Sequence, residues 1–82
     1  MESQEILAQI IVLMKKVFEN ENLNITPETT NKDVEEWDSL NYTAIISEIE
    51  KHFNIKFKMR EFLEFKNVGD IVGVVGSKIN KS

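Results

Sequence analysis

Apolar residues recur at three- and four-residue steps in three separate stretches of this chain, a repeat that indicates amphipathic α-helices. The stretches cover residues 6–18, 40–53 and 68–79 of the 82-residue sequence. The last stretch also holds three glycines and several β-branched residues, which disfavour a helix. The helical spacing prevails because a strand there would have no evident partner, and we expect a weak helix that frays. The pattern therefore predicts three longer helices.

The connections between these stretches predict one long loop and one short helix. Residues 19–37 show no sustained period, but apolar side chains are spaced there like anchors to a core: Leu23, Ile25, Val34 and Trp37. Within this loop, Thr26 and Pro27 are typical of the cap and the first position of a single helical turn. Residues 54–58 suggest a loop, and the next apolar residues suggest a short helix: Met59, Phe62, Leu63 and Phe65.

Together these segments predict an all-α fold with a single domain over residues 1–82. We expect a small four-helix bundle with three longer helices, a short third helix, and a long loop between helices one and two. No internal repeat or low-complexity tract suggests a second domain.

Composition and charge exclude several functions. The chain has no cysteine, so neither a disulfide nor a thiolate metal site can form. The net charge is −4, and residues 35–53 carry five acids and one base, which disfavours a nucleic-acid partner. The acids at 33–38 lack the register of a calcium loop, so we expect no metal site. No apolar stretch could span a bilayer and the N-terminus lacks a basic signal start, so we expect a cytoplasmic protein.

The segment "EEWDSLNY" at 35–42 places a serine at the start of the second helical stretch. By residue type, Asp38 or Ser39 is the N-cap of that helix, as Ser3 is of the first. A nucleophilic serine needs a nearby base, but the only histidine, His52, lies 13 residues further along the same predicted helix. The rise of a helix separates the two side chains by roughly 20 Å, so we reject a hydrolase. A helix cap, a phosphorylation target and an attachment point stay open for Ser39.

The whole arrangement resembles the acyl carrier protein family. The resemblance centres on "DSL" at 38–40, continues through "IISEIEKHF" at 45–53 and "NIKF" at 54–57, and includes "VGDIV" at 68–72. It implies that Ser39 carries a 4′-phosphopantetheine arm, added by a phosphopantetheinyl transferase, whose thiol holds acyl groups as thioesters. It also implies a carrier that is not an enzyme and that serves acyl-loading and acyl-transfer or condensing enzymes. We expect a monomer.

The resemblance assigns roles to residues around that serine. Asp38 and Leu40 would present Ser39 to the transferase, and Glu48 and Glu50 would contribute to the docking of partner enzymes. Five apolar residues are candidates for lining a transient acyl pocket, and each is explained equally well as ordinary core: Ile45, Ile46, Ile49, Phe53 and Phe62. A phosphodiester on Ser39 would also face the free N–H groups and the positive dipole end of a helix.

The charges depart from those of typical fatty-acid carriers. Neutral or basic residues stand where acids are usual: Asn41, Ala44 and Lys51. A basic cluster then follows: Lys56, Lys58 and Arg60. Because altered charges discourage wrong partners as well as attracting right ones, we expect a specialised lipid, surface-glycan or secondary-metabolite pathway and not general fatty acid biosynthesis. The competing hypothesis is a cofactor-free helical interaction adaptor in which Ser39 is only a helix N-cap.

Overall fold

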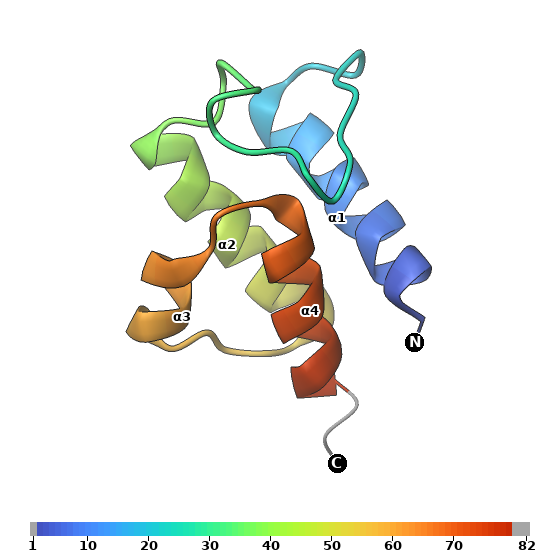
Figure 1. The fold of residues 1–82 in the computed structure, drawn as a ribbon, viewed down its shortest axis with the longest axis vertical. Coiled ribbons are helices and arrows are strands. Elements are labelled where there is room, and N and C mark those ends of the chain that lie inside the picture. The colour runs from blue at the N-terminus through green and yellow to red at the C-terminus, as the bar shows by residue number, and fades with distance from the viewer. Residues whose placement is uncertain (1, 80–82) are drawn as a thin grey trace.

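The computed structural model describes residues 2–79, and this part of the chain is helical without any strand. Figure 1 shows the four helices: α1 (Ser3–Phe18), α2 (Ser39–Phe53), α3 (Met59–Glu64) and α4 (Val68–Ile79). The prediction of an all-α bundle with a short third helix and a long first loop is confirmed. Over the described residues, no helix has both the length and the apolar character needed to cross a membrane.

The helix ends follow local capping rules, with one correction. Glu2, not Ser3, is the N-cap of α1, because Glu2 has the extended backbone of a cap (φ −72°, ψ 152°) and Ser3 is already the first helical residue. The Glu2 amide donates to Oε1 of Glu5 at 3.1 Å, which ties the first turn together. At the other end, α1 and α2 both stop at a left-handed residue, Glu19 and Asn54 respectively.

The core forms where the apolar faces of the helices meet. α1 packs against both α2 and α4, and the long loop covers one end of the bundle (Figure 1). Three of the four predicted loop anchors are buried, and the fourth, Leu23, packs against the core while partly exposed. The buried cluster consists of Ile6, Ile10, Leu13, Met14, Phe18, Ile25, Val34, Trp37, Ile45, Ile46, Ile49, Val68, Ile71, Val72 and Val75.

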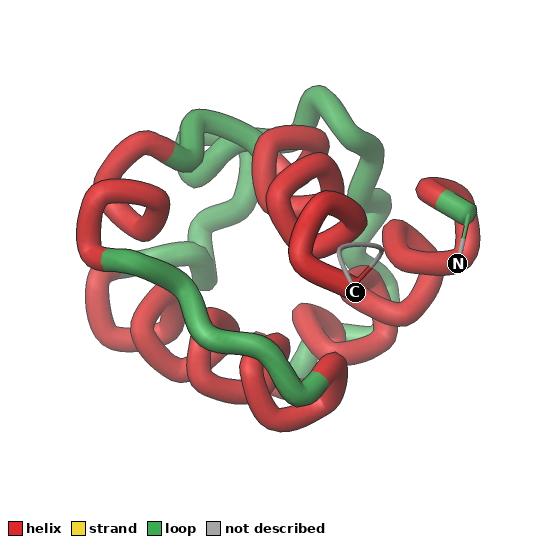
Figure 2. The backbone as a smooth tube through the Cα atoms, turned by 90° about the horizontal axis from the view of Figure 1, so that it is seen from below, coloured by secondary structure: helices red, strands yellow, loops and turns green. Residues whose placement is uncertain are grey.

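The short helix α3 has no fully buried residue. Hydrogen bonds, an ion pair and partly buried rings connect this region to the rest of the bundle. The connection 54–58 runs between α2 and α3 (Figure 2), and Oε2 of Glu50 accepts a hydrogen bond from the Phe57 amide at 2.8 Å. Nζ of Lys78 on α4 lies 3.0 Å from Oε1 of Glu61. Phe65, which we expected in α3, lies just past its end and meets Phe57 edge-on at 5.4 Å.

The long loop is also fastened to the start of α4. The turn predicted at residues 26–28 is present, closed by a bond from the Thr29 amide to the Thr26 carbonyl at 3.0 Å. We expected the Thr26 side chain to cap this turn. Instead, the Thr29 hydroxyl accepts from the Thr26 amide at 2.8 Å. The carbonyls of Pro27 and Thr29 then accept from the amides of Gly69 and Val68, at 2.7 and 3.0 Å. The turn therefore supplies backbone acceptors to α4.

Candidate functional site

Ser39 stands where the long loop becomes α2. It is the first residue of the helix and is exposed. Asp38 is the N-cap: its backbone is extended, and its Oδ1 accepts from the Asn41 amide at 2.8 Å. Between Asp38 and Ser39, the structure thus selects Asp38, because only the residue before the first helical one can cap. The hypothesis that Ser39 is only an N-cap is wrong.

Three hydrogen bonds hold the loop just before Ser39. The Trp37 amide donates to the Val34 carbonyl at 3.1 Å, and the Asp38 amide donates to the Glu36 carbonyl at 3.0 Å. Nδ2 of Asn41 donates back to the same Glu36 carbonyl at 2.8 Å. Our sequence reasoning treated Asn41 only as a missing acid. An amide in the first turn, after a cap, is the signal that could have indicated this bond.

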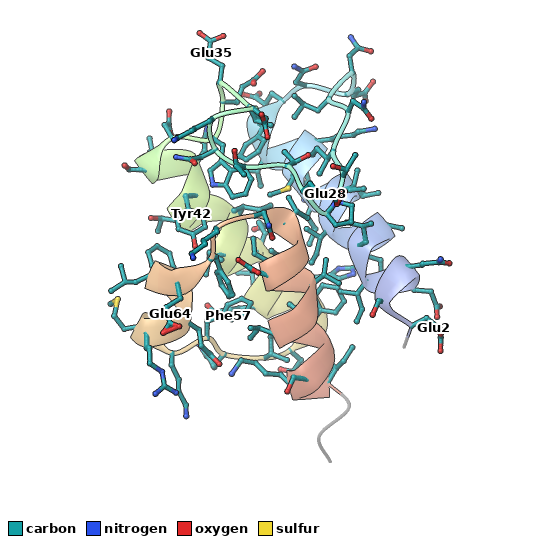
Figure 3. The ribbon with its side chains drawn as sticks, in the orientation of Figure 1. Glu2, Glu28, Glu35, Tyr42, Phe57 and Glu64 are labelled. Atoms are coloured by element: carbon teal, nitrogen blue, oxygen red, sulfur yellow. The ribbon has the colours of Figure 1, made fainter. Side chains whose placement is uncertain are left out.

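A row of four aromatic rings connects α1, the end of the long loop, α2 and α3. Phe18 and Trp37 have ring centroids 6.5 Å apart, Trp37 and Tyr42 6.1 Å, and Tyr42 and Phe62 4.6 Å, with the last pair stacked. Tyr42 projects from α2 toward α3 (Figure 3), and its hydroxyl donates to the Phe62 carbonyl at 2.6 Å. Burial raises the pKa of Tyr42 to about 12. We name these four residues the aromatic row; nothing in the sequence beyond the residue types indicates it.

The start of α2 can accept a phosphate ester on Ser39. The first intrahelical donor of α2 is the Tyr42 amide, which bonds to the Asp38 carbonyl at 2.8 Å, so the earlier amides of Ser39 and Leu40 are available to an anion. The carboxylate of Asp38, which would repel that anion, is turned to the Asn41 amide. Glu35 projects away from the outer edge of the loop (Figure 3). The exposed hydroxyl and the helix dipole therefore fit a covalently attached phosphodiester.

The other predicted docking residues lie in different surroundings. Leu40 is 79% exposed beside Ser39. Glu48 is partly exposed, and its Oε1 lies 3.9 Å from Nζ of Lys16 on α1. Glu50 uses its carboxylate to hold the Phe57 amide. The structure thus places Asp38 and Leu40 next to Ser39, and Glu48 and Glu50 two to three turns further along α2.

The five acyl-pocket candidates form a graded series. Ile45, Ile46 and Ile49 are buried in the core. Phe53 and Phe62 are partly buried and pack against that core from its edge. All five therefore belong to the hydrophobic core or pack against it.

The remaining chemistry-bearing groups do not converge on Ser39. Nε2 of His52 contacts Oε1 of Gln9 at 2.6 Å, and the histidine ring meets Phe53 edge-on at 4.8 Å. His52 lies at the far end of α2 from Ser39. Within residues 2–79, no three His, Cys, Asp or Glu side chains are placed to hold a metal ion together. No catalytic dyad is built on Ser39 by these groups.

Comparisons with known proteins agree with this geometry. The sequence pattern of the phosphopantetheine attachment site family matches residues 8–75. An acyl carrier protein homologue from Mycoplasma genitalium is 34% identical over 74 residues, covering 88% of this chain and 86% of the relative.

Two solved structures share the fold at high coverage. The holo acyl carrier protein of Geobacter metallireducens, solved by NMR, has a TM-score of 0.86 and 33% identity, and covers 92% of this chain and 86% of its own. An acyl carrier protein described as putative, from Mycobacterium tuberculosis, has a TM-score of 0.81 and 25% identity, with coverage of 89% and 97%.

Proposed function

Because this chain belongs to the acyl carrier protein family, we propose that Ser39 is the residue that bears its phosphopantetheine arm. The family fixes the role, a carrier and not a catalyst, and the cofactor, covalently attached 4′-phosphopantetheine. The single observation that carries the choice of Ser39 is its exposed position at the first turn of α2, inside the matched region.

The attachment step is a phosphoryl-type transfer from coenzyme A. The Ser39 oxygen bonds to the phosphorus that bears the pantetheine arm, the phosphoanhydride bond of coenzyme A breaks, and adenosine 3′,5′-bisphosphate leaves. The serine proton goes to the transferase. When bound, the arm supplies the thiol on which acyl groups are held as thioesters, because the chain has no thiol of its own.

The residues beside Ser39 present it to the transferase. Asp38 fixes the start of the helix through the Asn41 amide, so the serine backbone has one orientation. Leu40 is 79% exposed and therefore offers an apolar contact surface to the transferase. Glu48 and Glu50 are proposed as secondary docking residues, because both already have partners within the chain. Glu48 lies near Lys16, and Glu50 accepts from the Phe57 amide.

The charges near α3 support a specialised set of partners. The basic residues of this region are exposed: Lys51, Lys56, Lys58 and Arg60. Met59 and Leu63 are each 72% exposed between and beside them. We propose that the acyl-loading and acyl-transfer or condensing enzymes served by this carrier present acidic groups to that face, in a specialised lipid, surface-glycan or secondary-metabolite pathway. A cytoplasmic location stays a prediction.

A charge-reversal experiment tests the specialised role. Lys56→Glu with Lys58→Glu should weaken transfer to the cognate enzymes and should improve the carrier as a substrate of general fatty-acid elongation enzymes. If the unaltered carrier already supports fatty-acid elongation by the general enzymes at the same rate as their own carrier does, the specialised role is wrong.

Intact mass spectrometry tests the attachment point. After co-expression with a broad-specificity transferase, the chain should gain one phosphopantetheine, about 340 Da by its formula. Ser39→Ala should abolish this gain, whereas Ser47→Ala, which removes another exposed serine of α2, should leave it intact. A gain that survives in Ser39→Ala would place the arm elsewhere. An absent gain in the unaltered chain would contradict the proposed attachment at Ser39.

A further inference from the structure

The seam between α2 and α3 is closed at the end nearest Ser39. Tyr42 follows Ser39 by three residues, so it lies about 4.5 Å further along α2 and roughly 60° around it. Its ring stacks on Phe62 of α3 at 4.6 Å, and its hydroxyl holds the Phe62 carbonyl at 2.6 Å. On the other side, Trp37 packs against Tyr42 and is itself 7% exposed. We therefore expect an acyl chain that extends from the arm on Ser39 toward the interior to meet these rings first.

Behind the rings, the interior is filled by the inward face of α2. Tyr42, Ile45 and Ile49 follow each other at three- and four-residue steps, so they share one face. Ile45 and Ile49 are fully buried, and Ile46 beside them is nearly so. Tyr42 is therefore the first, partly buried member of this stripe and the one closest to Ser39.

Opening this seam would break several contacts together. The Tyr42–Phe62 stack would separate, and the Phe62 carbonyl would lose its hydrogen-bond donor. The phenol would have to find a new partner in a place where burial already raises its pKa to about 12. A short or polar acyl group brings little apolar surface to offset these losses, because the gain from burial scales with apolar area.

We propose that Tyr42 and Phe62 form a gate that keeps the acyl group outside the bundle, so that this carrier serves short or polar acyl groups and not long saturated chains. The inference rests on the proposed attachment at Ser39 and names the class of cargo for that site. Tyr42 and Phe62 act as specificity-determining residues through the packing of α3 on α2.

Thermal melting of acylated carriers tests the gate. A broad-specificity transferase loads Ser39 from butanoyl-, octanoyl- or tetradecanoyl-coenzyme A, and mass spectrometry verifies each product before melting. The three forms of the unaltered chain should melt within about 1 °C of one another, since no acyl group is buried. In Tyr42→Ala, the longer chains should raise the melting temperature by about 4 °C or more over the butanoyl form, because the opened seam now shelters them.

Matched variants separate the gate from general loosening of the fold. Phe62→Ala opens the same seam from α3 and should behave like Tyr42→Ala, which keeps the test available if one variant folds poorly. Tyr42→Phe retains the ring and should show a chain-length effect well below that of Tyr42→Ala. Phe57→Ala removes a ring of the separate Phe57–Phe65 pair and should show none.

Two results would overturn the gate. One is a rise in melting temperature with chain length in the unaltered carrier as large as in Tyr42→Ala. The other is the absence of any chain-length effect in both Tyr42→Ala and Phe62→Ala. Each of these results is obtained on carriers already loaded at Ser39, so it leaves the proposed attachment point standing, whereas a chain that cannot be loaded contradicts the attachment itself.

Discussion

The starts of α2 and α4 use the same capping chemistry but are completed differently. At α4, Oδ1 of Asn67 accepts from the Asp70 amide at 2.9 Å, and at α2, Oδ1 of Asp38 accepts from the Asn41 amide at 2.8 Å. The amides of Val68 and Gly69 are then taken by loop carbonyls, whereas the first two amides of α2 have no such backbone partner in the described part of the chain. One helix start is closed by the protein, and the other is left for an added anion.

The two starts also differ in what holds them in place. α4 is fixed by backbone hydrogen bonds from the turn at 27–29, together with the bond from the Lys66 amide to Oδ2 of Asp70 at 2.9 Å. The start of α2 is held by ring packing through Trp37 and Tyr42 and by the bond from Nδ2 of Asn41 to the Glu36 carbonyl. Side-chain packing leaves the backbone of the first turn exposed, and this is the arrangement that a modifying enzyme requires.

The largest effect should come from the glycines of α4, which test how tightly its start is closed. A Cβ on Gly69 would lie 3.1 Å from the Pro27 carbonyl oxygen, whereas a Cβ on Gly73 would meet nothing within 4 Å. We expect Gly69→Ala to lower the free energy of unfolding by about 1 kcal/mol and Gly73→Ala to raise it by up to about 1 kcal/mol. Urea denaturation of both variants measures the difference; equal gains would mean that the α4 start is not closely packed.

The caps provide the next test, because they should contribute equally at both starts. Asn67→Ala and Asp38→Ala each remove one bond to the third helical amide, and each should cost about 1 kcal/mol in denaturation. Only Asp38→Ala should also slow phosphopantetheine transfer to the folded chain. Slower transfer in Asn67→Ala, measured at equal folded fraction, would remove the distinction between the two starts.

The smallest effect concerns the hydroxyl of Tyr42 and appears at alkaline pH. Burial raises the Tyr42 pKa from its ordinary value near 10 to about 12, so the unfolded chain loses this proton at lower pH than the folded one. Stability from this group is therefore complete below pH 10 and is lost as the pH rises toward 12. Tyr42→Phe should cost only about 0.5 kcal/mol at neutral pH, at the low end of the net contribution of one hydrogen bond.

The measurement is the difference in unfolding free energy between the unaltered chain and Tyr42→Phe as a function of pH. The difference should shrink or reverse above pH 10, since only the unaltered chain carries this titrating phenol at position 42. A constant difference across the alkaline range would mean that Tyr42 is not desolvated by its packing against Phe62.

Local patterns in the sequence were sufficient for the helices and for the family. Apolar spacing predicted α2 from Leu40 to Phe53, one residue short of its observed start, because a cap and a first helical residue look alike by residue type. The same ambiguity made the cap of α1 wrong by one position. The identification of the acyl carrier protein family followed from "DSL" in its setting and is confirmed.

Contacts between distant segments could not be read from those patterns. Glu50 lies on a surface-like position of α2 by periodicity, yet its carboxylate holds the Phe57 amide. The Tyr42–Phe62 bond and the carbonyls that close α4 likewise join residues about 20 to 40 positions apart. Such pairings depend on how the helices are oriented in space, which a periodicity along one helix does not specify.

The aromatic row also has a practical consequence. Trp37 is the only tryptophan of the chain, and it lies between Phe18 and Tyr42, two residues before Ser39. Its indole emission therefore reports on this one place, without labels and without background from other tryptophans. Movement of the rings during loading or unloading of cargo would change that fluorescence directly, which makes the protein its own optical probe for stopped-flow kinetics.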